Sequence, residues 1–156
     1  MTPVEGRSTV CVYYDAPESP LDDPILVLDG DNVGPINNVV VPSDVAPGYA
    51  PDDRALVGAV VVGDPPEPDA DLERAVREQL IDWFGLQAGG WDHLQTMRIP
   101  YALPDQSPPF LQEPDRAVRR RPGLYVCGDH RRTGSLNGAI ASGRAAARAI
   151  LEDRSS

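Results

Sequence analysis

The residues best placed for chemistry lie near the C-terminus, between Gly123 and Leu151. Residues 123–127 predict a short buried strand, and residues 135–151 predict a helix built mainly from small side chains. Gly128 and Asp129 follow the predicted strand, so a carboxylate stands at the strand's end. A carboxylate there can bind a sugar or ribityl hydroxyl, and the unpaired N–H groups of a helix start suit a partly negative oxygen. Together these features predict half of a cofactor site.

The other half of such a site is absent from the sequence. A dinucleotide's pyrophosphate is normally held by a Gly-rich turn at the start of a βαβ unit, and none of the 156 residues forms such a motif. No metal site or hydrolytic triad is expected, because His93 and His130 are the only histidines and Cys127 lacks further ligands at a useful spacing. The acidic stretch at 29–32 favours a turn over a calcium loop, since its spacing is wrong and a distal Glu is missing.

Residues 123–151 resemble the C-terminal, flavin-contacting βα unit of the FAD-dependent amine oxidase and phytoene desaturase-like superfamily. The segments 24–28, 34–43 and 98–104, with Pro108-Pro109, are similar to the desaturase-like branch. The resemblance therefore covers nearly the whole chain, as the C-terminal third or so of a family member. It implies an FAD-dependent oxidoreductase that moves a hydride from a C–N or C–C bond of a small-molecule substrate to flavin.

The resemblance also implies roles for single residues. It places the carboxylate of Asp129 on a ribityl hydroxyl and uses Gly128 for close backbone approach. It places a backbone N–H of Leu136 or Asn137 against the flavin C2 carbonyl. The alternative from the residues alone is an Asp129 that caps its own loop and binds water. No catalytic residue is assigned.

Two departures from the family pattern fall in the same loop. Ser135 occupies the position at which amine oxidases carry an aromatic residue of the amine cage, and the loop 133–138 lacks the Pro- and Gly-rich form of carotenoid desaturases. Ser135 is still expected to be one of the residues that contact the cofactor. Gly138 and Ala139 are expected to let the cofactor and a sheet come close. A stripe of small residues at 138, 142, 146 and 149 predicts tight helix packing, with or without a ligand.

Charge and composition limit the partners. The chain has 14 basic residues, all Arg, against 24 acidic residues, a net charge of −10, so nucleic acid and anionic membrane surfaces are not expected partners. Two explanations of this composition compete: adaptation to high salt, and a GC-rich coding bias that favours Arg over Lys. No apolar run is long enough for a membrane span, and no secretory leader is expected after Met1. With Cys11 and Cys127 expected as buried, reduced thiols, the chain is predicted to be cytoplasmic.

The remaining sequence predicts a sheet with one helix. Strands are expected over 8–14, 25–28, 36–41, 55–62 and 93–103, with 55–62 buried on both faces and 25–28 and 36–41 forming a hairpin. A helix is expected from Asp69 or Asp71, either of which would cap it, to Phe84. Its apolar stripe would be Leu72, Val76, Leu80, Trp83 and Phe84. Gly85 and Leu86 predict a left-handed end with an apolar contact.

The fold class expected is α/β (α+β). Residues 1–120 would form a partial substrate-binding domain, a mixed sheet with one helix, and residues 121–156 the last strand–helix unit of a Rossmann-like FAD-binding domain. The Pro-rich crossing 106–122 separates them; its cluster Arg119–Arg121 is expected to be a solvated linker, with phosphate contact as the alternative.

A second hypothesis is a non-catalytic truncated remnant, or a subunit that needs a separate N-terminal-half polypeptide to bind FAD. Strand 124–127 would then have open edges, and the small-residue stripe would have no sheet to cover. Open edges and uncovered apolar faces predict self-association or pairing with that polypeptide.

Overall fold

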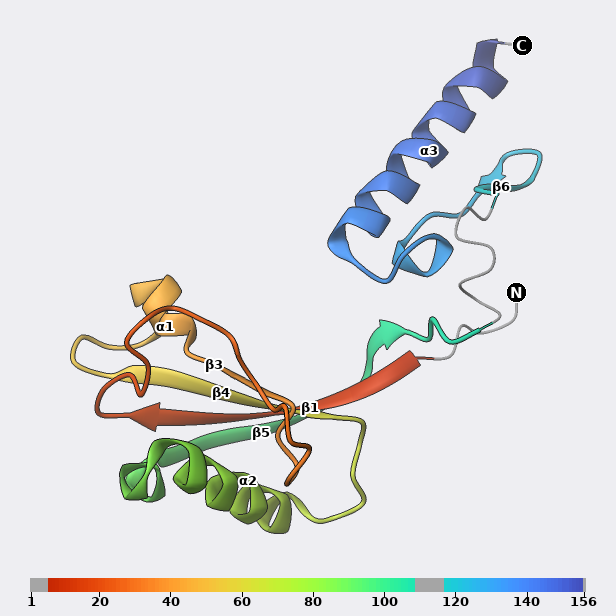
Figure 1. Cartoon of the computed structure of the whole chain (residues 1–156). Helices are drawn as coiled ribbons and strands as arrows, with labels where there is room; N and C mark the ends of the chain where they lie inside the picture. Colours follow the sequence, from red (N-terminus) through yellow and green to blue (C-terminus); the bar gives the residue numbers. More distant parts are fainter. Residues whose placement is uncertain (1–5, 109–116, 156) are drawn as a thin grey trace. The chain divides into compact units, whose positions relative to one another are not determined.

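The computed structural model describes residues 6–108 and 117–155. The chain divides into two compact units, shown with their elements in Figure 1. The sheet unit spans Ser8–Pro100, and the C-terminal unit comprises the described residues 6–7, 101–108 and 117–155. This division falls about twenty residues before the boundary expected between residues 120 and 121. Residues 109–116, which include Pro109 and part of the predicted crossing, lie outside the described residues. The assignment of the two units to substrate and FAD domains stays a prediction.

A five-stranded sheet forms the frame of the sheet unit. Its strands are β1 (Gly6–Ala16), β2 (Val27–Leu28), β3 (Asn38–Val40), β4 (Ala55–Val62) and β5 (Asp92–Pro104), in the order β2-β3-β4-β1-β5. β4 pairs antiparallel with β1, from Thr9 opposite Val62 to Ala16 opposite Ala55, and β3 pairs antiparallel with both β4 and β2. The α+β class and the hairpin of 25–28 with 36–41 are confirmed.

Burial in the sheet follows the sequence pattern. Along β1 every second residue from Val10 to Ala16 is fully buried, as expected of a strand with one face on the core. β4 lies in the middle of the sheet, as predicted, and alternate residues from Ala55 to Val61 are buried. Its second face is covered only in part, because Leu56 and Val60 are half-buried and Val62 is exposed. The turn before β3 is held by Asp29, whose Oδ1 accepts the N–H groups of Asp31 and Asn32, as turn chemistry requires.

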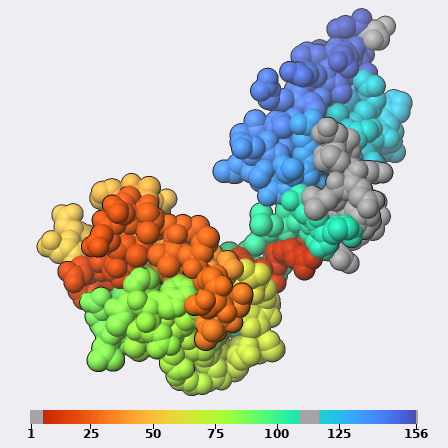
Figure 2. Space-filling view, in the orientation of Figure 1, coloured from red at the N-terminus to blue at the C-terminus, as the bar shows by residue number. Residues whose placement is uncertain are grey.

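Helix α2 (Asp69–Phe84) covers this sheet with the predicted stripe. Leu72, Val76 and Leu80 are buried, and Trp83 and Phe84 pack at the edge of the core. Figure 2 shows the preceding hairpin segment, in orange, resting against α2, in green. The buried side chain of Gln79 fixes that contact, because its Oε1 accepts the N–H of Ile36 at 2.8 Å.

Both predicted ends of α2 need correction. The N-cap residue is Pro68, and no side chain caps the helix; Asp69 and Asp71 lie inside the first turn, where their charge favours the helix start without a capping bond. At the other end Gly85 has a positive φ of 83° but an extended ψ of 179°. Leu86 is 88% exposed, so the apolar contact of a left-handed cap is not made. Short helices α1 (Pro42–Val45), η1 (Pro47–Tyr49) and η2 (Leu86–Gly90) complete this unit.

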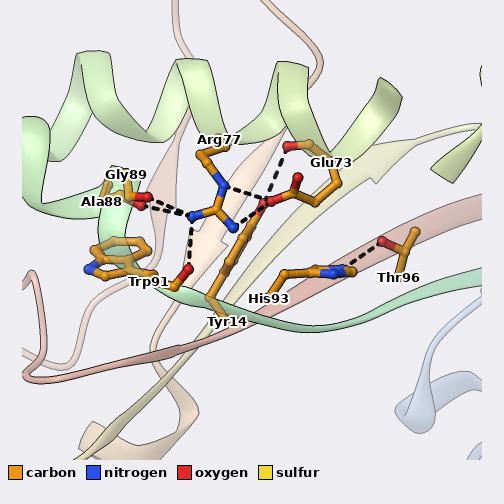
Figure 3. A network of polar contacts seen from close by, with 8 residues as sticks. All are labelled: Tyr14, Glu73, Arg77, Ala88, Gly89, Trp91, His93 and Thr96. Atoms are coloured by element: carbon orange, nitrogen blue, oxygen red, sulfur yellow. Dashed lines mark hydrogen bonds and ion pairs between the residues drawn. The ribbon is translucent and has the colours of Figure 1, made fainter. Parts of the chain in front are cut away.

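A polar network around Arg77 joins α2 to the chain that follows it (Figure 3). The guanidinium donates from Nε to Oε1 of Glu73 at 2.8 Å, and from Nη1 to the carbonyl of Trp91 at 2.8 Å. The carbonyls of Ala88 and Gly89 lie at 3.3 and 3.2 Å from the same Nη1. One side chain of α2 therefore holds the second half of η2 and the residue before β5.

The ring of Tyr14 lies directly beneath this guanidinium. The Cζ atom of Arg77 stands 4.9 Å from the ring centroid, and the Tyr14 hydroxyl donates to the backbone carbonyl of Glu73 at 3.5 Å. Tyr14 is fully buried and also meets Trp91 and His93 in tilted and edge-on ring contacts. Burial raises the pKa of the Tyr14 phenol, with a further contribution from Glu73.

The C-terminal unit is smaller and differs more from expectation. It contains a hairpin of β6 (Arg119–Arg121) with β7 (Leu124–Tyr125), the turn η4 (Asp129–Arg131) and helix α3 (Leu136–Ser155). The arginine cluster is thus a strand and not a linker. None of the helices in the described residues is long and apolar enough to cross a membrane.

The prediction of a buried strand over 123–127 is wrong. β7 has two residues, Leu124 is 41% exposed, and Cys127 is exposed. The only described strand beside β7 is the short β6, so no described strand pairs with its other edge. The expected burial of Cys11 is only partial.

The small-residue stripe of α3 is buried as predicted. Gly138, Ser142, Ala146 and Ala149 are the buried residues of this helix. Among the described residues, sixteen of the buried hydrophobic side chains belong to the sheet unit, and Ala146 and Ala149 are the other two. The C-terminal unit is therefore held by close backbone approach and hydrogen bonds more than by large apolar side chains.

Candidate cofactor site

Gly128 begins the loop between β7 and α3. Its φ of 144° belongs to a region that side chains other than glycine rarely adopt, and a Cβ there would stand 2.7 Å from the ring of His130. Its N–H donates to the Oγ of Ser142 at 3.2 Å, and its carbonyl accepts the N–H of Arg131 at 3.1 Å. The loop is thus fixed to α3 at its first residue.

Asp129 takes the loop-capping role that was considered for it, and its role toward a ribityl hydroxyl stays a prediction. Its Oδ1 accepts the N–H of His130 at 2.7 Å, so the carboxylate does cap its own turn. The Nδ1 of His130 lies 3.8 Å from the same oxygen, and the Asp129 side chain is 37% exposed. Within the described residues no donor reaches Oδ2. One carboxylate oxygen is consumed by the loop, and the other is free for a hydroxyl of a ligand.

The first turn of α3 presents two backbone donors. Ser135 caps the helix, because its Oγ accepts the N–H of Gly138 at 3.0 Å and its carbonyl accepts that of Ala139 at 2.9 Å. The N–H groups of Leu136 and Asn137 have no acceptor in the part of the chain that the structure describes. These are the two donors that the resemblance assigned to the flavin carbonyl.

Gly138 has an internal reason to be glycine. A Cβ at this position would lie 1.9 Å from the carbonyl oxygen of Thr133, which is backbone and cannot move aside cheaply. Gly138 does allow another group to come close, as predicted, but that group is the backbone of the chain's own loop at Thr133 and not a cofactor or a sheet. The N–H of Ala139 is used inside the helix, and its role toward a cofactor stays a prediction.

Ser142 contributes a hydrogen bond to the candidate site that the sequence analysis, which placed it only in the small-residue stripe, did not predict. It is 1% exposed, and its hydroxyl holds Gly128, the residue before Asp129. The sequence did contain a signal for this hydrogen bond, because Ser142 is the one hydroxyl-bearing residue in a stripe of otherwise apolar small residues. Ser135 was predicted to bind the cofactor and was noted as a missing aromatic, but not as a cap, although a serine just before a predicted helix is a common N-cap.

The donor set fits one side of a flavin cofactor. Two free N–H groups at a helix start suit a carbonyl oxygen that gathers negative charge, and a half-exposed carboxylate oxygen suits a sugar-alcohol hydroxyl. Among the described residues no group of three or more His, Cys, Asp or Glu side chains could hold a metal ion. No Gly-rich pyrophosphate turn stands in the sequence.

Residues 4–151 match the family of flavin containing amine oxidoreductases. The chain belongs to this family. The amine oxidase part of the resemblance drawn from the sequence is thereby confirmed, and flavin is the family's cofactor. The desaturase-like branch stays a prediction. No curated protein matches the chain.

Solved structures share the fold at low sequence identity. An oxidoreductase from Methanosarcina mazei is 19% identical with a TM-score of 0.62, over 96% of this chain and 35% of its own. A candidate protoporphyrinogen oxidase from Exiguobacterium is 17% identical with a TM-score of 0.58, over 98% and 36%. A protein from Pyrococcus furiosus is 16% identical with a TM-score of 0.56, over 96% and 32%. This chain therefore spans about a third of the length of these proteins.

Proposed function

We propose that this chain supplies the flavin-ring and ribityl side of the cofactor site in an FAD-dependent oxidoreductase. One observation carries the proposal: the unpaired N–H groups of Leu136 and Asn137 begin the same helix to which Ser142 ties the Asp129 loop. Acceptor and donors for a flavin are thus held by one rigid element. Membership of the flavin amine oxidoreductase family supports the same assignment.

FAD, when bound, would accept a hydride from a C–N or C–C bond of a small-molecule substrate. The N–H of Leu136 or Asn137 would donate a hydrogen bond to the ring carbonyl oxygen. The positive end of the α3 dipole favours negative charge at that oxygen, which lowers the energy of the reduced state. The free Oδ2 of Asp129 would accept a hydrogen bond from a ribityl hydroxyl and so help to hold the cofactor.

The substrate side of the proposal rests on the sheet unit. We assign it to a partial substrate-binding domain. Ser135 is the N-cap of α3 and carries no aromatic ring, so this chain offers no wall of an amine cage at that position. We therefore propose oxidation of a C–C bond as well as oxidation of an amine as the reaction. A cytoplasmic site of action is part of the proposal, because an exposed thiol such as Cys127 is best kept reduced there.

The pyrophosphate cradle must come from outside these 156 residues. The solved relatives are about three times as long as the part this chain matches, so the cradle belongs to the rest of a longer chain or to a separate N-terminal-half polypeptide. Helix α3 offers an apolar side for it: Leu136, Ile140 and Leu151 are 86%, 62% and 64% exposed. The second candidate function, a non-catalytic remnant that has lost this partner, would leave the same side chains exposed.

Flavin retention tests the proposal. The chain would be purified alone and together with an N-terminal-half polypeptide of the family, and FAD absorbance would be measured after gel filtration. We expect the chain alone to be colourless and the complex to be yellow. In the complex, Asp129→Ala should weaken FAD binding roughly tenfold, the scale of one hydrogen bond to a charged group. Asp52→Ala, an exposed aspartate of the sheet unit, is the matched control.

Two results would contradict the proposal. Stoichiometric FAD on the chain alone would show that it holds the pyrophosphate without an external cradle. Equal FAD affinity for Asp129→Ala and Asp52→Ala would remove Asp129 from the site. A stable complex that binds no flavin would favour the remnant.

A further inference from the structure

Charge is distributed very unevenly along this chain. The sheet unit, residues 8–100, has seventeen acidic residues and four arginines, a net charge of −13. The described stretch 117–155 has eight arginines and three acidic residues, a net charge of +5. A basic segment in a chain with a net charge of −10 is not explained by solubility, which the acidic residues already provide.

Part of this positive charge surrounds a groove. The groove has a volume of about 730 Å³ and lies between the β6–β7 hairpin and the last turn of α3, which stand side by side in Figure 1. Arg120 and Arg121 line it from the hairpin, and Arg154 lines it from the helix. Pro122, Tyr125 and Ile150 supply its apolar lining. The volume is within the range of about 300–1,000 Å³ that is usual for small-molecule sites.

The one carboxylate that lines the groove, Asp153, is already neutralised inside the protein. It pairs with the guanidinium of Arg119 and accepts the hydroxyl of Tyr125. This hydrogen bond raises the pKa of Tyr125, so the phenol stays neutral and keeps donating. Arg119 also reaches the carbonyl of Ala149 at 3.5 Å. Arg119 therefore braces the hairpin against α3 and is not available to a ligand.

The other three guanidiniums are available. In the described part of the chain, the side chains of Arg120, Arg121 and Arg154 make no hydrogen bond or ion pair, and all three residues are exposed. Arg154 also offsets the partial negative charge at the end of α3. Three unpaired charges of one sign around one groove repel each other unless an anion lies between them.

The groove is distinct from the candidate cofactor site. It includes Ile150 and Arg154 of α3, whereas the flavin donors are Leu136 and Asn137. Fourteen residues of helix separate the two ends, about 20 Å at 1.5 Å per residue. A flavin carbonyl at the start of α3 and a ligand at its end would not touch the same residues.

We propose that this groove binds a phosphorylated small molecule of nucleotide size. Its phosphates lie among Arg120, Arg121 and Arg154, whose guanidinium forks match phosphate oxygens in pairs. Its flat, less polar part rests on Pro122, Tyr125 and Ile150. An acidic protein segment is less suited, because it would use the charges and leave the apolar lining empty. The inference goes beyond the flavin function and does not depend on it.

Nuclear magnetic resonance titration of the whole chain tests this site. ADP, inorganic pyrophosphate and adenosine would be added at constant ionic strength while backbone amide shifts are followed. We expect saturable shifts at Gly123, Tyr125, Ile150 and Arg154 with ADP, weaker binding with pyrophosphate, and none with adenosine. Arg120→Gln should weaken ADP binding roughly five- to tenfold, because one charged contact partly screened by water is lost.

Two further variants make the result decisive. Arg144→Gln removes one charge from an exposed position of α3 outside the groove and should change ADP affinity less than about twofold. Arg121→Lys keeps the charge but loses the paired fork, and should weaken ADP binding roughly threefold. Arg121→Lys also tests the site if Arg120→Gln fails to fold, a failure that the dispersion of the amide signals would reveal.

The proposal is overturned by any of three outcomes. Equal losses for Arg120→Gln and Arg144→Gln, with no loss for Arg121→Lys, would mean that net charge alone attracts the nucleotide. ADP shifts confined to the Asp129 loop would place the nucleotide at the cofactor end. Binding of a polyglutamate peptide without binding of ADP would make the groove a contact for an acidic protein.

Discussion

Replacing Arg77 by methionine should destabilise the sheet unit strongly. Methionine keeps most of the side-chain length but removes the charge and all the donors of the guanidinium. Glu73 would remain 18% exposed with no cation beside it, and the carbonyl of Trp91 would lose its donor at 2.8 Å. The stacking on the Tyr14 ring would be lost as well.

The cost follows from the burial of the pair. Removing one partner of a fully buried ion pair costs roughly 3–5 kcal/mol, and a hydrogen bond to a charged group contributes about 1.5–3 kcal/mol. Arg77 and Glu73 are 21% and 18% exposed, so water partly solvates whatever remains. We therefore expect a loss near the lower end, about 3 kcal/mol in the free energy of unfolding.

Urea unfolding followed by tryptophan fluorescence measures this loss. Trp91 is 5% exposed and Trp83 packs against the same core, so their emission reports the sheet unit. With a typical denaturant slope, about 3 kcal/mol lowers the midpoint by roughly 1–2 M. Arg74→Met is the control: its pair with Asp71 is 65% and 47% exposed, and its loss should cost less than about 0.5 kcal/mol.

A midpoint for Arg77→Met within 0.3 M or so of Arg74→Met would refute this reasoning, because it would mean that water replaces the network without loss. A double-mutant cycle with Glu73→Gln separates the ion pair from the carbonyl contacts. Coupling below about 0.5 kcal/mol would assign the effect to the carbonyls and the Tyr14 ring.

Two further predictions concern Gly138 and Tyr14. Gly138→Ala should lower the free energy of unfolding by roughly 1–3 kcal/mol and speed hydrogen exchange in α3, because the added Cβ meets the Thr133 carbonyl at 1.9 Å. Gly143→Ala, whose Cβ meets nothing within 4 Å, should slow hydrogen exchange in α3. A change in the same direction for both variants would contradict the packing argument. The raised pKa of Tyr14 means that the unfolded chain releases this proton above about pH 10 while the folded chain keeps it, so stability from this group is complete below pH 10 and falls above it. Tyr14→Phe should flatten the fall in thermal midpoint above pH 10, and the exposed Tyr49→Phe should not; equal slopes would show that Tyr14 titrates normally.

The parts of the fold that the sequence predicted well are those decided by local pattern. The unbroken apolar run 55–62 has no polar face, so only a central strand accommodates it, and the α2 stripe follows helical spacing. The small-residue stripe of α3 is buried at each predicted position. The strand 123–127 failed because burial of Leu124 and Cys127 depends on strands beside them, which no local pattern encodes.

The candidate site was predictable to a similar degree. Asp129, Leu136 and Asn137 lie where a strand–loop–helix pattern puts them. Ser142 was not found, because its hydrogen bond to Gly128 joins residues fourteen positions apart and depends on how the loop folds back over the helix. The role of Gly138 toward Thr133 depends on the same fold-back.

The burial of glycine, serine and alanine along α3 also has a consequence for the life of the protein in a cell. Such side chains withdraw little apolar surface from water, so the C-terminal unit gains little free energy from its own closure. A ligand that binds only the closed form adds to that small gain in proportion to the logarithm of its concentration over its Kd. Under the proposed function, flavin is such a ligand: chains without flavin would open first around α3, and proteases would clear them while the sheet unit is still folded.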